Sequence, residues 1–233
     1  MSSAFLDGPR LSPLSGQPAR QLVVLLHGYG ADGDDLIQLA KIWQPQLAHA
    51  AFIAPHAPEE CELTPFGRQW FSLNRYDPTL SRRDPHAIEQ ALDALTPGAE
   101  TAAPKIEAFL DAELERLSLG WQDLALVGFS QGTMMALYTA LRHPVGPAGI
   151  LGYSGALVAP GTLARDIRCK PPVCLIHGEE DDILPIAALE HARRVLQSLS
   201  VPVETTARPS LSHGIDETGL ALGQRFLGGL FNG

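Results

Sequence analysis

Cysteine is scarce in this chain of 233 residues, which contains only Cys61, Cys169 and Cys174. Their odd number and the lack of a Cys-x-x-Cys pair argue against a disulfide framework and a zinc site. Cys174 lies in the apolar run Val173–Ile176, where we expect its thiol to pack as a small buried hydrophobic group.

Positive charge is also in short supply. The chain has 17 lysines and arginines against 26 aspartates and glutamates, which gives a formal net charge of -9. Nucleic acids and anionic membranes bind cationic protein surfaces, so we expect neither as a main partner.

Long apolar runs are missing as well. No run approaches the roughly 20 residues that cross a bilayer, and residues 1–20 lack the basic start and apolar stretch of a signal peptide. We therefore expect no stable membrane insertion and a cytoplasmic location. The composition, 45% hydrophobic and 18% charged, is typical of a globular protein with a sizeable core.

Shorter apolar runs alternate along the chain with amphipathic stretches. Five of these runs are continuously apolar, as strands covered on both faces should be, and Val201–Thr206 is a more polar sixth. Alternating strands and helices predict an α/β fold, with a mostly parallel central sheet and helices on both faces. The five apolar runs are Gln21–Leu26, Ala50–Ala54, Leu124–Val127, Ala148–Tyr153 and Val173–His177. The predicted helices are Lys105–Leu117, Gln131–Arg142, Pro185–Leu199 and Leu220–Leu230.

No linker divides the chain, so we expect residues 1–233 to form a single domain. The stretch Glu59–Asp84 is long, aromatic and contains prolines. Loops of this length are often functional, and we expect this one to cover part of an active site at the edge of the sheet.

The segment Gly128–Gly132 reads GFSQG and fits the pattern G-x-S-x-G, with Ser130 at its centre. A chain of this length matches the pattern by chance about one time in ten. Here an apolar strand leads into the segment and an amphipathic helix leaves it, which is the setting of the nucleophile in an α/β hydrolase. The glycines are needed because a side chain at either position would collide with the neighbouring helix or strand.

A serine nucleophile needs a histidine base, and in α/β hydrolases both the acid and the histidine follow the serine. Four histidines follow Ser130. His143 ends the helix that starts at the nucleophile and points away, His177 is expected to cap a strand, and His191 is expected at a solvated helical position. His213 lies in a loop after the last strand, from which it can reach over Ser130, and is predicted to be the base.

The acid is expected from the loop that follows Val173–His177. Spacing alone does not choose among its carboxylates, and most of them are expected to compensate the dipole of the next helix. The four candidates are Glu179, Glu180, Asp181 and Asp182.

The first strand runs into the glycine-rich segment His27–Leu36, which reads HGYGADGDDL. Glycines there let the backbone approach a bound acyl group, and this loop is expected to donate one N–H to an oxyanion while the N–H of Gln131 donates the second. A phosphate-binding loop is disfavoured because G-x-x-x-x-G-K-[ST] is missing. Gly28–Gly33 does match G-x-G-x-x-G, but the acidic partner of that pattern is missing from the end of the next apolar run, Ala50–Ala54.

Five segments, in order along most of the chain, resemble the phospholipase/carboxylesterase family of α/β hydrolases, which includes the acyl-protein thioesterases. Tyr29 and the run Gln69–Phe71 look more like its bacterial carboxylesterase branch. The segments are His27–Leu36, Gly67–Phe71, Gly128–Met134, Gly152–Gly155 and His177–Pro185.

The resemblance implies residue roles that spacing left open. In the family pattern H-G-x-x-D the acid is the fifth residue, which is Asp181 here, with Asp182 as the fallback. The oxyanion donors of the family fall on the backbone N–H groups of Tyr29 and Gln131.

Trp70 and Phe71 fall where relatives line the acyl pocket, although ordinary core packing is the alternative reading. The resemblance further implies no metal and no cofactor, a modest cover over the site, and in several members a homodimer. It implies short- to medium-chain esters, lysophospholipids or acyl thioesters as substrates.

We therefore expect a serine hydrolase that cleaves carboxylic esters through an acyl-enzyme on Ser130, with Asp181 and His213 completing the triad. Two rival readings remain: a catalytically silent hydrolase fold that binds a ligand, and a peptidase of the same fold. Both triad partners are present, which disfavours the first, and no long lid or extra domain for peptides is visible, which disfavours the second.

Overall fold

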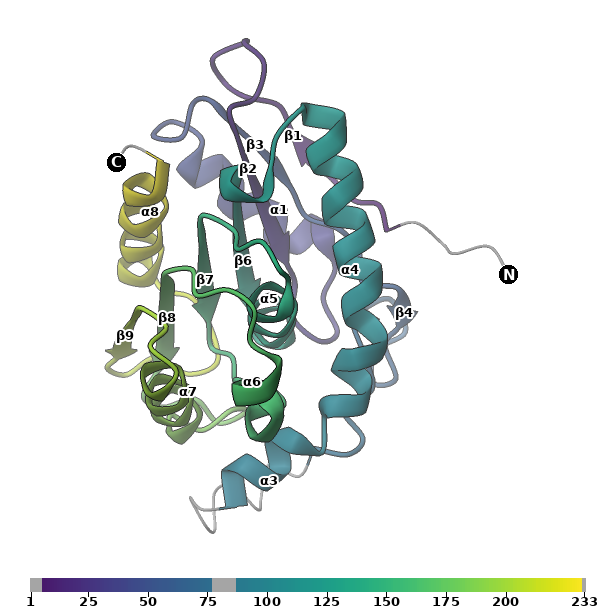
Figure 1. Ribbon diagram of the computed structural model, residues 1–233, viewed down its shortest axis with the longest axis vertical. Helices are drawn as coiled ribbons and strands as arrows, with labels where there is room; N and C mark the ends of the chain where they lie inside the picture. The colour runs from purple at the N-terminus through teal and green to yellow at the C-terminus, as the bar shows by residue number, and fades with distance from the viewer. Residues whose placement is uncertain (1–5, 77–86, 232–233) are drawn as a thin grey trace.

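A twisted sheet of seven strands forms the centre of the molecule (Figure 1). The computed structural model describes residues 6–76 and 87–231. The strand order is β1-β3-β2-β6-β7-β8-β9, and all neighbours are parallel except β1, which pairs antiparallel with β3. The strands are β1 (Arg10–Leu11), β2 (Gln21–Leu26), β3 (Ala50–Ile53), β6 (Leu124–Phe129), β7 (Gly149–Tyr153), β8 (Val173–Gly178) and β9 (Val203–Arg208).

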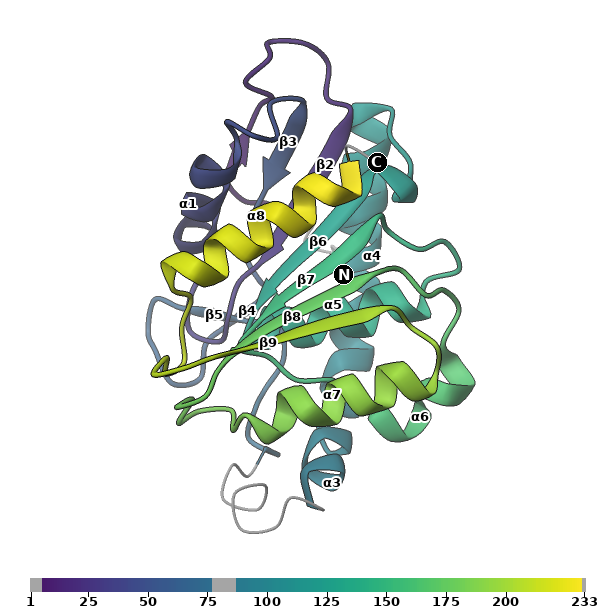
Figure 2. The same cartoon turned by 90° about the vertical axis from the view of Figure 1, so that its left-hand side faces the viewer.

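Helices cover both faces of this sheet. Buried side chains of α1 and α8 pack on one face of the sheet, and those of α4, α5 and α7 pack on the other. In Figure 2, α8 crosses in front of the strands and α7 lies below them. Side chains along β2 alternate between the two layers, since Leu22 and Val24 join the α4–α5 core and Val23 joins the α1–α8 core. The helices are α1 (Gly33–Trp43), α3 (Ile88–Asp93), α4 (Thr96–Leu117), α5 (Gln131–Arg142), α6 (Pro160–Asp166), α7 (Ala187–Ser198) and α8 (Glu217–Phe231).

The architecture is the predicted α/β-hydrolase fold, and all six predicted strands and four predicted helices are present. The structure adds α1, α3, α6 and the short strand β1, and it starts α4 at Thr96 rather than at Lys105. None of the helices within residues 6–76 and 87–231 combines the length and apolar character needed to cross a membrane.

The predicted loop Glu59–Asp84 contains regular structure. Its first part forms the antiparallel hairpin β4 (Glu59–Glu60) and β5 (Arg68–Gln69). Residues 77–84 of the predicted loop lie outside the described residues. Because the five inner strands are parallel, their carboxyl ends meet at one edge, and the segments that leave them carry the predicted site residues.

Candidate active site

Ser130 occupies a sharp turn between β6 and α5. Its backbone has φ 53° and ψ -116°, a conformation that residues with a side chain rarely adopt. Strained backbone of this kind is typical of functional turns. The side chain is largely buried, with 8% of the residue exposed.

The two glycines of the turn are required by their neighbours. A Cβ on Gly128 would overlap the backbone of Thr133 in α5, and a Cβ on Gly132 would overlap the carbonyl oxygen of Leu26 at the end of β2. These are the helix and strand collisions expected from the sequence. Without the glycines, β6 and α5 cannot pack this closely against β2.

Asp181 and His213 form a hydrogen-bonded pair although 32 residues separate them. His213 Nδ1 lies 2.8 Å from Asp181 Oδ2, and the Asp181 carboxylate is fully buried. The other oxygen, Oδ1, accepts hydrogen bonds from the backbone N–H groups of Ile183 and Leu184 at 2.9 and 2.8 Å. Asp182 is exposed. The geometry therefore singles out Asp181 as the carboxylate that orients His213.

A second histidine, His177, contacts the same carboxylate. Its Nε2 lies 3.2 Å from Asp181 Oδ2 and 2.9 Å from the carbonyl oxygen of Leu184, and the residue is 1% exposed. Burial acts to raise the pKa of Asp181, but hydrogen bonds from His177, His213 and the Leu184 N–H outweigh it and hold the pKa below its usual range. Asp181 is thus ionised at neutral pH.

Backbone and side-chain contacts bring the His213 loop next to Ser130. The N–H of Ser130 donates to the carbonyl oxygen of Tyr153 at 2.9 Å, and the hydroxyl of the next residue, Ser154, donates to Gly214 at 3.1 Å. The ring of Phe129 lies 5.1 Å from the ring of His213, centroid to centroid. Within the described residues the Ser130 hydroxyl makes no hydrogen bond, and the one side-chain hydrogen bond of His213 goes to Asp181.

The remaining downstream histidines lie elsewhere. His143 stacks on Trp121 with ring centroids 3.6 Å apart. His191 was expected to be solvated, and that prediction is wrong: it is 4% exposed, because this side of α7 packs toward α3, where Glu89 lies 3.9 Å away. Burial lowers the pKa of His191.

Two backbone hydrogen bonds join the loop that follows β2 to the β4–β5 hairpin. The N–H of Gly30 donates to the carbonyl oxygen of Arg68, and the N–H of Arg68 donates to that of Ala31, both at 2.9 Å. Among the described residues, the N–H groups of Tyr29 and Gln131 make no hydrogen bond, so both remain available to a ligand. The Tyr29 hydroxyl donates to Glu62 at 3.3 Å.

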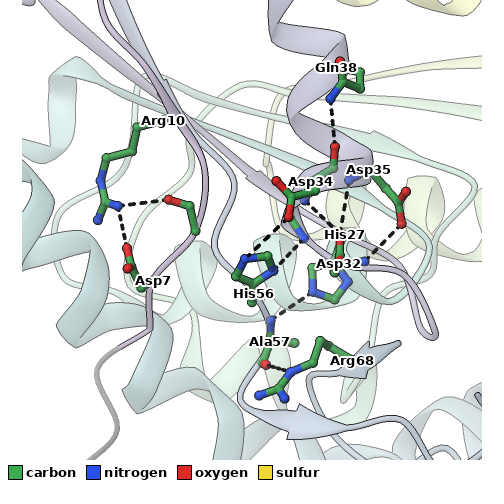
Figure 3. A network of polar contacts seen from close by, with 12 residues as sticks. Asp7, Arg10, His27, Asp32, Asp34, Asp35, Gln38, His56, Ala57 and Arg68 are labelled. Atoms are coloured by element: carbon green, nitrogen blue, oxygen red, sulfur yellow. Dashed lines mark hydrogen bonds and ion pairs between the residues drawn. The ribbon is translucent and has the colours of Figure 1, made fainter. Parts of the chain in front are cut away.

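His27 anchors the start of this loop from a fully buried position. Its Nδ1 lies 2.8 Å from the carbonyl oxygen of Gly28, and its Nε2 accepts the N–H of Ala57 at 2.9 Å (Figure 3). Burial lowers the pKa of His27 to about 4, so the ring is neutral at pH 7. A neutral ring with its proton on Nδ1 satisfies both contacts at once.

Gln131 ties the nucleophile turn to the Trp70–Phe71 backbone. Its Oε1 accepts the N–H of Trp70 at 3.0 Å, and its Nε2 donates to the carbonyl oxygen of Phe71 at 2.7 Å. The indole N–H of Trp70 donates to the backbone carbonyl oxygen of His27 at 2.9 Å. Trp70 and Phe71 are 1% and 3% exposed, which places both rings in the core beneath the site.

Three side chains near this loop have the composition of a possible metal site. Ligand atoms of Asp32, Asp34 and His56 lie within 4.8 Å of one another (Figure 3). However, Asp32 Oδ1 accepts the N–H of Asp34 at 2.8 Å, and His56 Nδ1 accepts the N–H of Gly33 at 3.2 Å. These contacts cap the first turn of α1, whose positive end opposes a cation.

Known proteins share both this sequence and this fold. The sequence profile described as Phospholipase/Carboxylesterase matches residues 14–230. Acyl-protein thioesterase 1 of Saccharomyces cerevisiae is 30% identical over 192 residues, which cover 78% of this chain and 79% of the relative. Esterase YpfH of Escherichia coli is 27% identical over 202 residues, covering 86% and 78%. The crystal structure of esterase PE8 superposes with a TM-score of 0.87 at 42% identity, covering 97% and 99%.

Proposed function

The chain belongs to the phospholipase/carboxylesterase family and is an ester or thioester hydrolase; from this premise we propose that it works through an acyl-enzyme on Ser130. One observation carries the proposal: His213 contacts the buried carboxylate of Asp181 and lies 5.1 Å, ring to ring, from Phe129, the residue before a serine in strained backbone at the start of a helix. This is the arrangement that nucleophilic acyl transfer requires.

In the first step His213 Nε2 takes the proton of the Ser130 hydroxyl as its oxygen attacks the acyl carbonyl carbon. The carbonyl oxygen becomes an oxyanion, which accepts hydrogen bonds from the N–H groups of Tyr29 and Gln131. These two N–H groups have no other partner among residues 6–76 and 87–231, which supports this assignment, as does the position of Gln131 in the first turn of α5.

Collapse of the intermediate breaks the bond to the leaving oxygen or sulfur. His213 gives its proton to that atom, and the alcohol or thiol departs, which leaves the acyl group on Ser130. Water then attacks with His213 again acting as base, and the acid and the free serine are released. Asp181 stays ionised throughout and holds the proton of His213 on Nδ1.

We propose short- to medium-chain carboxylic esters as substrates, with acyl thioesters and lysophospholipids as further candidates. The names of the relatives, an acyl-protein thioesterase and two esterases, support both ester and thioester chemistry. That Trp70 and Phe71 contact the acyl chain stays a prediction, and their burial fits the alternative reading, ordinary core packing. A cytoplasmic location and a homodimer likewise stay predictions.

Nitrophenyl esters test this proposal. With excess nitrophenyl acetate the wild-type protein should release a burst of nitrophenol equal to the enzyme concentration, provided that deacylation is the slower step. Ser130→Ala should show neither burst nor turnover while unfolding at the wild-type temperature. Turnover by Ser130→Ala would contradict the proposal. Nitrophenyl esters of increasing chain length, a palmitoyl thioester and a lysophospholipid then rank the substrate classes.

A further inference from the structure

An apolar pocket opens beside the proposed catalytic residues, on the α1 side of the sheet. It has a volume of about 280 Å³, and its walls include Gly28, Leu36, Phe129 and Ile215. Leu36 comes from α1, Phe129 from the end of β6, and Ile215 from the segment between β9 and α8. None of these residues has a part in the mechanism derived above.

The pocket adjoins the reacting atoms through Gly28 and Phe129. A Cβ placed on Gly28 would lie 3.3 Å from the Cβ of Ser130 and 3.0 Å from Cδ1 of Phe129. Because Gly28 has no side chain, this wall of the pocket lies directly beside the nucleophile. The Phe129 ring also lies against His213, at 5.1 Å between centroids. Ile215 follows His213 by two residues.

Position relative to His213 decides which part of an ester fits here. In the tetrahedral intermediate the oxyanion faces the N–H groups of Tyr29 and Gln131, and the leaving atom must lie within reach of His213 to receive its proton. The group attached to the leaving atom therefore extends along the His213 side of the site. The pocket is lined by Phe129, whose ring lies against His213, and by Ile215, two residues after His213, so it suits that group, whereas the acyl chain leaves the tetrahedral carbon in another direction.

The wall chemistry limits what this group is. Leu36, Phe129 and Ile215 present carbon atoms, and Asp35 supplies the one carboxylate of the lining. That carboxylate accepts the N–H of Asp32 at 3.3 Å as part of the cap of α1. An apolar wall with a negative group disfavours an anionic substituent. The volume lies just below the roughly 300–1,000 Å³ of drug-sized sites, which suits one or two rings or a short alkyl chain.

We infer that this pocket, here called the leaving-group pocket, binds the alcohol or thiol part of the substrate and selects uncharged apolar leaving groups. The inference rests on the proposed function, because it assigns His213 the protonation of the leaving atom. On this inference, substrate specificity is divided between two places. The leaving-group pocket selects the alcohol or thiol part, and a separate part of the site binds the acyl chain.

Filling the pocket tests the inference. In Leu36→Trp and, from a different element, Ile215→Trp, kcat/KM should be measured for two ester series. One series varies the alcohol, from methyl acetate to 1-naphthyl acetate, and the other varies the acyl chain, from methyl acetate to methyl octanoate. The quantity compared is the ratio of variant to wild type for each ester, which cancels the intrinsic reactivity of the alcohol. kcat/KM is used because it reports acylation even where deacylation limits kcat.

Both variants should lower this ratio by about tenfold for 1-naphthyl acetate relative to methyl acetate, the scale of steric exclusion in an apolar pocket. The ratio should stay level along the acyl series. Added 1-naphthol should inhibit the wild-type enzyme competitively and both variants more weakly. Ile42→Trp is the matched control: it lies on the same helix with 50% of its surface exposed, and it should keep wild-type rates in both series.

The inference is overturned if the ratio falls along the acyl series while the alcohol series stays level, or if both series fall together in variants that unfold at the wild-type temperature. It is also overturned if neither series responds. Failure of the proposed function looks different, because Ser130→Ala would then still turn over methyl acetate.

Discussion

The two sides of the active site are built in different ways. The elbow side, which we define as Gln131, Trp70 and His27, the residues that support the turn at Ser130, is fixed by buried hydrogen bonds between side chains and backbone. On the loop side, defined as Asp181, His177 and His213, only the carboxylate and His177 are buried, and the His213 side chain is 17% exposed. Changes on the elbow side should therefore cost mainly stability, and changes on the loop side mainly catalytic rate.

The largest effect is expected on the loop side, for Asp181→Asn. An amide does not stabilise the imidazolium and favours the wrong tautomer of His213, so kcat should fall by about 10⁴-fold. The temperature of thermal unfolding should stay close to that of the wild type. Asp182→Asn is the matched control, because this neighbour is exposed, and it should retain wild-type kcat. Equal losses in both variants would contradict the assignment of Asp181.

The next effect is expected on the elbow side, for Gln131→Ala. The change leaves the N–H of Trp70 and the carbonyl oxygen of Phe71 without partners in the core, which should lower the free energy of unfolding by about 2–4 kcal/mol. Urea unfolding measures it. The exposed Gln38→Ala on α1 should change it by less than about 0.5 kcal/mol. A normally stable Gln131→Ala would remove the contrast between the two sides.

His27 should make the elbow side sensitive to acid. Its pKa in the folded protein is lowered to about 4 by burial, below the value of 6.5 for an unperturbed histidine. As the pH falls from 6.5 to 4, His27 therefore becomes protonated in the unfolded chain but stays neutral in the folded protein. The free energy of unfolding should decline over that window by about 3 kcal/mol.

Urea unfolding of wild type and His27→Gln at pH 7.5, 5.5 and 4.5 isolates this contribution. The Gln side chain keeps an acceptor for the N–H of Ala57 but does not titrate, so its pH dependence should be shallower. Identical slopes for the two proteins would show that His27 is not the group responsible.

The smallest effect is expected for His177, which acts on the reaction only through Asp181. His177→Phe removes a hydrogen bond to the carboxylate and should lower kcat/KM by about tenfold, mainly through kcat. His177→Gln restores a donor near the position of Nε2 and should recover most of the rate. A purely structural role for His177 would instead lower the stability of both variants and leave kcat unchanged.

Local patterns explain what could be predicted of the fold. The inner strands are continuously apolar because helices cover both of their faces, and this signal located β2, β3, β6, β7 and β8 within one or two residues. The strands β1, β4 and β5 have two residues each, too few for any periodicity. Pro97 and Pro104 made the first part of α4 look non-helical in the sequence, because proline disfavours the interior of a helix. The helix nevertheless contains both residues.

In the site too, residues with a local sequence pattern could be predicted and residues without one could not. The position of Ser130 follows from a local pattern of strand, turn and helix, and the structure places it in such a turn. The carboxylate that contacts His213 could not be chosen by spacing, because its partner lies 32 residues further along the chain. Only the resemblance to the family pointed to Asp181, and that pattern also contains His177, whose contact with the acid was missed. The glycine that follows His177 was the available signal that this turn lies close to the His213 segment. A Cβ on Gly178 would overlap the carbonyl oxygen of Leu211, two residues before His213.

The most direct test of the account is covalent labelling of the nucleophile. A fluorophosphonate reacts with an activated serine, and digestion followed by mass spectrometry locates the adduct. The account predicts one adduct per chain, on the peptide that contains Ser130, and no labelling of Ser130→Ala. An adduct on another residue, or a Ser130→Ala protein that still labels and still hydrolyses esters, would contradict it.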